Sequence, residues 1–213
     1  MPTLSDQFVF FSILSAILMG AISPGPSFVL VSRAAIAGTR LTGAIAAVGM
    51  GVGGSIFAAL ALLGLNALLL QSLWLFAALK LLGGAYLIYL GIRIWQGAAQ
   101  PLSTTGVTGA AMPNGRMFLS SLLTQLSNPK TAVVYASIFA VLLPPTPDAW
   151  LLVVLPPAVF AVEAGWYLVV ALVFSSATPR AVYARAKAWI DRAAGAVMAG
   201  LGARLMLDGA GLR

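Results

Sequence analysis

The sequence predicts an all-α polytopic membrane protein, in which six transmembrane helices form two inverted repeats of three helices each. Three observations lead to this fold class. Most of the chain is apolar, the apolar residues fall into stretches long enough to cross a bilayer, and the two halves of the chain match in sequence. The first and fourth helices are expected to be broken, because each carries a proline-containing motif in its interior.

Composition indicates a bilayer environment. Hydrophobic residues make up 61% of the 213 residues and charged residues only 8%, against roughly 25% charged in a soluble domain. A soluble fold of this length cannot bury so much apolar surface. The net charge of +7 includes no basic run, so we expect the lipid bilayer, and not nucleic acid, to be the partner of the basic residues.

The chain has no cysteine and no histidine, and this narrows its chemistry. Disulfides, thiol catalysis and histidine-based triads are excluded. The best ligands for zinc are also absent, so neither a metal site nor a cofactor is expected. Few acidic residues remain to act as a pair, so an enzyme acting on lipid is the weaker alternative.

A bilayer core requires roughly 20 apolar residues per helix, and six stretches meet that requirement. They are Phe8–Val31, Thr42–Leu65, Leu73–Trp95, Phe118–Leu143, Trp150–Ser175 and Trp189–Leu207. The long link after the third stretch is polar and rich in glycine, as a solvated loop is. We therefore expect a first repeat over residues 1–97, a cytoplasmic loop over 98–117 and a second, inverted repeat over 118–213.

Basic residues predict the orientation. They gather in the odd-numbered links, all of which lie on one side of the membrane: Arg33, Arg40, Arg93, Arg116, Arg180, Arg185 and Lys187. The positive-inside rule makes this side cytoplasmic, so both termini are expected outside.

Two alignments between the halves indicate an internal repeat. Residues 13–24, ILSAILMGAISP, match 118–129, FLSSLLTQLSNP, and residues 84–93, GAYLIYLGIR, match 195–204, GAVMAGLGAR. Because each unit has an odd number of helices, the second copy must be inverted, and inverted repeats recur in secondary transporters.

The two proline motifs lie at matching positions of this repeat. In SPGP, Pro24 and Pro26 cannot donate hydrogen bonds to the carbonyls of Gly20 and Ile22, and in SNPK the same holds for Pro129 and Gln125. A simple kink is the alternative explanation of either motif alone, but paired breaks favour a binding site at the membrane midplane. The candidate substrate-binding residues are Ser23, Pro24, Gly25, Pro26, Ser27, Gln125, Asn128, Pro129 and Lys130.

Two ionisable residues lie deep in apolar segments, where charge is costly and usually functional. Lys130 lies about halfway along its stretch and can hold a substrate carboxylate or pair with a carboxylate side chain. Glu163 is the only acidic residue deep in a segment. Burial disfavours its ionised form, so Glu163 and Lys130 are the candidates for proton coupling. The alternative is that Glu163 is a silent ion-pair partner of Lys130.

Three further residues are candidates to line the substrate path. Lys80 lies about two turns inside the third stretch, where snorkelling to the interface is an equal alternative. Tyr135 and Tyr167 lie within a few turns of Lys130 and Glu163, and each alone is also explained by packing. Asp191, next to Arg192, is expected to form an interfacial ion pair.

Together, SPGPSFVLVSRAAIAGTRLTGAIAAVGMGVG, LKLLGGAYLIYLGIRIW and FLSSLLTQLSNPKTAVVY resemble the lysine exporter family, the LysE/RhtB group of amino-acid exporters. The family's Pro-Gly-Pro falls on residues 24–26, and its Asn-Pro-Lys falls on residues 128–130. The resemblance covers nearly the whole chain. It implies efflux of amino acids or their derivatives from the bacterial cytoplasm by proton motive force, a cytoplasmic-membrane location and a homodimer.

The leading hypothesis is therefore a secondary transporter that exports a small zwitterionic substrate, an amino acid or derivative, by proton antiport. The substrate carboxylate would meet backbone donors at the breaks and Lys130, and its ammonium would meet freed carbonyls and Glu163. An exporter of another small solute or cation, and a passive channel, are the alternatives. The direction of transport rests on the resemblance alone.

Overall fold

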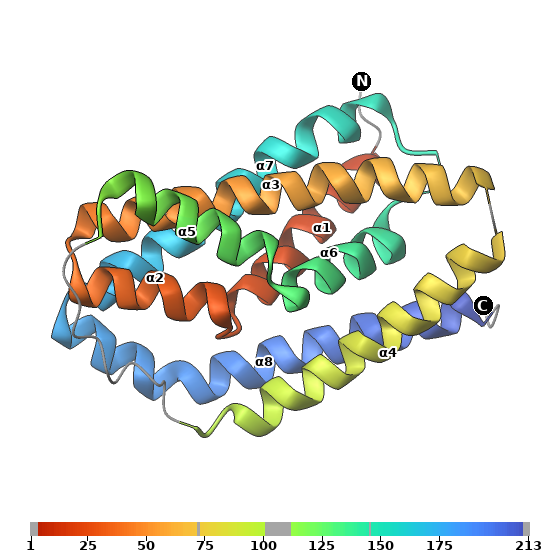
Figure 1. Ribbon diagram of the computed structural model, residues 1–213. Helices are drawn as coiled ribbons and strands as arrows, with labels where there is room; N and C mark the ends of the chain where they lie inside the picture. Colours follow the sequence, from red (N-terminus) through yellow and green to blue (C-terminus); the bar gives the residue numbers. More distant parts are fainter. Residues whose placement is uncertain (1–3, 72, 101–111, 145, 211–213) are drawn as a thin grey trace.

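The computed structural model describes residues 4–71, 73–100, 112–144 and 146–210, and within these residues every regular element is an α-helix (Figure 1). The helices are α1 (Leu4–Ile22), α2 (Pro26–Ala37), α3 (Arg40–Gln71), α4 (Leu73–Gly97), α5 (Asn114–Leu126), α6 (Pro129–Leu142), α7 (Ala149–Phe174) and α8 (Ala177–Gly209).

The predicted stretches correspond to these helices in order. The first stretch is the pair α1 and α2, and the fourth is the pair α5 and α6. Both breaks fall at the proline motifs, as expected. The axes of α1 and α2 meet at 62°.

The sixth stretch was predicted too short. It was expected to begin at Trp189, but α8 begins at Ala177, so Arg180, Arg185 and Lys187 lie within the helix and not in a link. Hydropathy identifies only the part of a helix whose residues are apolar enough to lie in the lipid bilayer. Alanine, arginine and lysine are good helix formers and extend the helix beyond that part.

The ion pair expected for Asp191 is present, but its partner is not the neighbouring Arg192. Asp191 pairs with Lys187, one turn earlier on α8, and both side chains are buried. Arg192 instead lies over the ring of Trp189, with its guanidinium carbon 5.6 Å from the ring centroid. Residues four apart share a helix face, whereas adjacent residues point in different directions.

By length and apolar composition, two single helices of the described part qualify as membrane spans, α3 over Arg40–Gly64 and α7. The bent pair α1 and α2 counts as a third span. The chain is thus a polytopic membrane protein, while the number of six spans stays a prediction. Helix α8 carries Arg185, Lys187, Asp191 and Arg192 within two turns, and this charge lowers its mean hydropathy.

Proline alone does not explain the α1–α2 break, because α7 contains Pro156 and Pro157 and remains one helix. The difference lies at Gly25, between the two prolines of SPGP. Gly25 is extended (φ −143°, ψ −171°), and Pro26 starts α2 at the first helical position, where a missing N–H costs nothing. Adjacent prolines, with φ fixed near the helical value, have no such extended residue between them.

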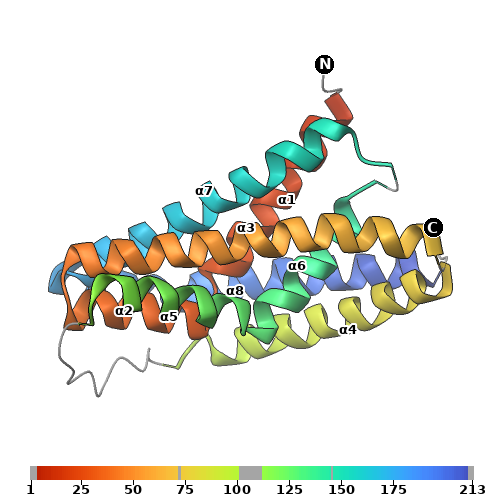
Figure 2. The same cartoon turned by 45° about the horizontal axis from the view of Figure 1, so that its top comes forward.

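Three groups of helices pack together (Figures 1 and 2). Helix α3 lies along α7 and α5 on one side, and α4 lies along α8 on the other. Helices α1 and α6 lie between these sides. Helix α1 contacts α7 and α8, and helix α6 contacts α3, α4 and α8. The breaks are therefore placed in the interior of the bundle.

Four glycines bring α4 and α8 into backbone contact. A Cβ at Gly84 would lie 2.7 Å from the carbonyl oxygen of Gly202, and one at Gly202 would lie 2.5 Å from that of Gly84. Gly91 and Gly195 face each other in the same reciprocal way, at 2.5 and 2.7 Å. Such small-residue contacts are typical of membrane helix pairs, since they allow close van der Waals packing.

These contacts predict different effects for two glycines of α8. Gly202→Ala should lower the apparent melting temperature in detergent, because its methyl group meets backbone, and overpacking typically costs about 1–3 kcal/mol. Gly200→Ala is the matched control, because a Cβ there meets nothing within 4 Å. Thermal unfolding followed by circular dichroism compares the two. Equal melting temperatures would contradict the packing of α4 against α8.

Candidate functional site

The α1–α2 break and the start of α6 meet at one buried cavity, which α7 closes from a third side. Its lining combines an apolar part from α1 and α6 with a polar part from the breaks and α7: Ile17, Gly20, Ala21, Ser23, Gly25, Ser27, Asn128, Lys130, Thr131, Val134, Tyr135, Glu163 and Tyr167. The two proline motifs, about a hundred residues apart in sequence, thus form one site.

Side chains satisfy the backbone at the α1–α2 break. The indole nitrogen of Trp166 donates to the carbonyl of Ala21 over 3.1 Å, and Lys130 Nζ donates to the carbonyl of Ser23 over 2.9 Å. A freed carbonyl in hydrocarbon is costly unless a donor reaches it. Helices α7 and α6 therefore hold the broken segment in place.

The second break is organised around Asn128. Its backbone is extended, its side-chain oxygen accepts from the backbone N–H of Lys130 over 3.1 Å, and Pro129 occupies the first helical position of α6. Asparagine before a proline is a strong combination of N-cap and helix start. Helices α2 and α6 therefore both begin at a proline beside the cavity, and both direct the positive ends of their dipoles there.

A chain of hydrogen bonds joins the two breaks to Glu163. Asn128 donates to Ser27 Oγ over 3.1 Å, and Ser27 donates to Gln125 Oε1 over 2.6 Å. Gln125 then donates to Glu163 Oε2 over 3.3 Å, and the Tyr135 hydroxyl donates to Glu163 Oε1 over 2.8 Å. All five side chains are at most 5% exposed. Each oxygen of the Glu163 carboxylate therefore has a donor within the protein.

Lys130 and Glu163 do not form a salt bridge in this structure. The ammonium of Lys130 bonds to the Ser23 carbonyl, and the carboxylate of Glu163 is held by Gln125 and Tyr135. The two charges lie within electrostatic range of each other across the cavity. The interpretation of Glu163 as a simple ion-pair partner of Lys130 is therefore not supported by a direct contact.

The remaining sequence candidates divide into three groups. Tyr135 and Tyr167 line the cavity, as does Gly25. Pro26 and Pro129 instead line an open groove beside α5, and Gln125 lies behind the cavity in the hydrogen-bond chain. Lys80 lies apart from the cavity residues, next to Gly209 at the end of α8.

The sequence predicts no site role for Trp166 of α7 or for Gly53 and Gly54 of α3, whose GMGVGG segment predicts only close helix packing. A Cβ at Gly54 would lie 2.8 Å from the Tyr135 hydroxyl, and one at Gly53 would lie 2.7 Å from Cγ of Gln125. These glycines make room for the side chains that hold Glu163. The available signal was a tryptophan in the middle of an apolar segment, since its N–H requires an acceptor there.

The cavity is small in this structure. It leaves about 20 Å³ for the centres of water molecules, room for roughly one or two waters. A molecule of several heavy atoms enters only when the surrounding helices move apart.

A broken-helix site with buried charges, inside a bundle of apolar helices, is characteristic of membrane transporters. Comparison with known proteins agrees with this class. Residues 18–209 match the family described as LysE type translocator, and the chain belongs to that family. It is accordingly a translocator and not an enzyme.

Relatives cover nearly the full chain. The threonine efflux protein of Salmonella typhi is 31% identical over 94% of this chain and 98% of its own length. The threonine efflux protein of Escherichia coli K12 is 30% identical over the same shares. The uncharacterized membrane protein YahN of E. coli K12 is 26% identical over 88% of this chain and 84% of its own. No solved structure matches.

The hydrogen-bond chain predicts that Gln125 stabilises the protein. Gln125→Leu removes both of its bonds and leaves Ser27 and Glu163 each with one partner fewer in a buried site, at a cost of about 1–3 kcal/mol. Thermal unfolding in detergent measures the loss. Thr124→Val, in the open groove on another face of α5, is the control and should change little.

Proposed function

We propose that this protein exports small amino acids, threonine among them, in exchange for protons. The observation that carries the proposal is the charge layout of the cavity. Glu163 supplies a carboxylate on the α7 side, while Lys130 and the N-terminal ends of α2 and α6 supply positive potential on the other. Opposite charges across a small cavity match a zwitterion.

Each end of an amino acid has a partner in this layout. The substrate carboxylate would accept hydrogen bonds from Lys130 and from backbone N–H groups at the start of α2 or α6, as anions do at helix N-termini. The ammonium would approach Glu163 and displace one of its present donors. The names of the threonine efflux relatives support threonine as a substrate, and a lining that includes Val134 and Thr131 suits a side chain with one methyl and one hydroxyl group.

Proton exchange would depend on Glu163. Ionised Glu163 binds the ammonium group, and protonated Glu163 does not attract it. Protonation from the outside would therefore release the amino acid there, and loss of the proton to the cytoplasm would restore the site. The small volume of the cavity supports alternating access over a permanently open channel, because helices must move before an amino acid fits.

We further propose that residues 1–97 and 118–213 belong to inverted repeats. The predicted loop over 98–117 is shorter at its end, because α5 begins at Asn114, and its residues 101–111 lie outside the described part of the chain. The reciprocal glycine contacts support the inverted repeats. The sequence repeat pairs Gly84 with Gly195 and Gly91 with Gly202, so a two-fold operation converts the contact between Gly84 and Gly202 into that between Gly195 and Gly91. Both contacts are present. The same two-fold operation exchanges α1 with α5 and α2 with α6. It therefore converts the packing of α1 on α6 into the packing of α5 on α2, and both contacts are present.

The proposed location is the bacterial cytoplasmic membrane, with both termini outside. The basic residues at the helix ends that flank the first and third links, with those in the first part of α8, support this orientation. The family resemblance supports a homodimer.

Glu163→Gln should uncouple transport from the proton gradient. The amide keeps the size of the side chain and one acceptor, but it cannot take up or release a proton. In proteoliposomes loaded with radiolabelled threonine, wild-type efflux should accelerate with an inward proton gradient, and the variant should show no such acceleration. Lys130→Met should lower the apparent affinity for threonine with or without the proton gradient, because it removes the positive side chain of the site.

Asp148→Asn is the matched control for Glu163→Gln. Asp148 caps the start of the same helix from outside the cavity, and asparagine caps equally well, so transport should keep its response to the gradient. If Glu163→Gln retains that response, proton coupling through Glu163 is wrong. If the wild-type protein moves none of a panel of amino acids, the proposed substrate class is wrong.

A further inference from the structure

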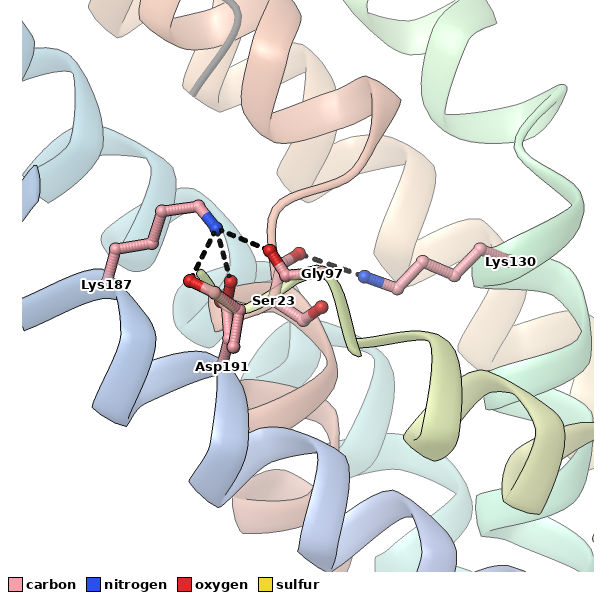
Figure 3. Close-up of polar contacts among 6 residues, drawn as sticks. Ser23, Gly97, Lys130, Lys187 and Asp191 are labelled. Atoms are coloured by element: carbon pink, nitrogen blue, oxygen red, sulfur yellow. Dashed lines mark hydrogen bonds and ion pairs between the residues drawn. The ribbon is translucent and has the colours of Figure 1, made fainter. Parts of the chain in front are cut away.

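A second group of buried charges lies outside the cavity, on α8. Lys187 Nζ and Asp191 Oδ2 are 2.7 Å apart, and the residues are 7% and 3% exposed (Figure 3). Neither residue lines the cavity. Glu163 and Lys130 account for the charges of the proposed transport site, so this pair requires an explanation of its own.

Lys187 also joins α8 to the end of α4. Its ammonium lies 3.3 Å from the carbonyl oxygen of Gly97 and 3.4 Å from that of Ala98, at the C-terminal end of α4. A cation is favourable there, because the helix dipole presents its negative end and free carbonyls. Asp191 holds the ammonium in that position. The pair therefore determines where α4 ends relative to α8.

Ser23, at the α1–α2 break, lies near both Lys130 and the helix that carries this pair. Figure 3 shows Ser23 between Lys130 on one side and the pair of Lys187 and Asp191 on the other. Asp191 and Lys130 lie within electrostatic range of each other. Helix α8 packs against α1, which ends at the break, and against α6, which carries Lys130. Lys130 therefore bonds to the break directly, and α8 packs against the helix that ends there.

Two buried polar atoms on this side have no hydrogen-bond partner within the described residues, Ser23 Oγ and Asp191 Oδ1. Unsatisfied buried groups cost stability and are rare in native proteins. Buried ion pairs are also poor stabilising devices, since well-packed apolar residues of similar size often serve equally well. Stability alone therefore does not account for the charges at 187 and 191.

We propose that Lys187 and Asp191 are positioning residues for the transport site, a role that rests on the proposed function. They keep the end of α4 and the face of α8 against the α1–α2 break, so that Ser23 presents its carbonyl to Lys130. Lys130 is then held over the cavity without pairing with Glu163. Loss of the pair releases the break while the helices stay folded.

The test uses the double variant Lys187→Met with Asp191→Leu, which removes both charges without leaving one unpaired in the interior. Because the chain has no cysteine, Ser23→Cys gives a single thiol at the break. Its rate of reaction with a water-soluble methanethiosulfonate, measured in membranes without substrate, reports the accessibility of the break. We expect labelling to become at least about tenfold faster in the double variant, as local opening of a buried segment predicts.

Two controls separate positioning from general loosening. Ala58→Cys places a thiol in the buried core of α3, and its labelling should not change with the double variant. Arg192→Gln, on the residue next to Asp191, should leave Ser23→Cys labelling unchanged. Unaltered labelling at residue 23, or equal acceleration at residues 23 and 58, would overturn the proposal.

Transport kinetics add a second readout. In otherwise unaltered protein, the double variant should raise the KM for threonine about tenfold while its melting temperature stays near that of the wild type. Wild-type KM and rate would overturn the positioning role. If the double variant does not fold, Asp191→Asn decides the same questions. It removes the ion pair but keeps the shape of the side chain and an oxygen that can accept from Lys187, which also retains the carbonyls of Gly97 and Ala98. Failure of the wild type to transport threonine contradicts the proposed function only, since the labelling result does not depend on substrate.

Discussion

The backbone carbonyls at the α1–α2 break impose the constraint on which the rest of the site depends. Inside an apolar bundle, a broken helix persists only where donors reach its free carbonyls. Trp166 and Lys130 supply these donors from α7 and α6. To supply these donors, α6 and α7 must pack against the end of α1, and Lys130 is held over the cavity as a result. The same interactions that make the break tolerable thus build the site.

Hydrogen bonding also explains how a carboxylate is kept in this interior. Gln125 and Tyr135 each donate to one oxygen of Glu163, and Gln125 is linked onward to Ser27 and Asn128. A change in hydrogen bonding at either break can therefore reach the Glu163 carboxylate through this chain. A substrate that displaces one member of this chain changes the partners of the others. Such a connected polar network is a physical basis for linking substrate binding, protonation and movement of the broken helices.

Helices α4 and α8 form the other half of this arrangement. Their glycines bring the two backbones into contact along the pair, and Lys187 joins the end of α4 to α8 below the break. They meet the remaining helices mainly through α1 and α6, the helices next to the two breaks. A displacement of this pair relative to α3 and α7 would therefore act mainly on the helices beside the cavity.

Apolar periodicity and proline chemistry are local properties, so the helices, both breaks and the position of Lys130 and Glu163 inside the bundle could be predicted from the residues alone. The partners of these residues could not. That Lys130 bonds to Ser23 and not to Glu163, that Trp166 caps Ala21, and that Asp191 turns toward Lys187 depend on which helix faces are brought together. Pro156 and Pro157 also show that local sequence is insufficient, since these prolines lie in an unbroken α7. Local sequence states which groups need partners in an apolar interior, and packing between distant helices selects the partner each one receives.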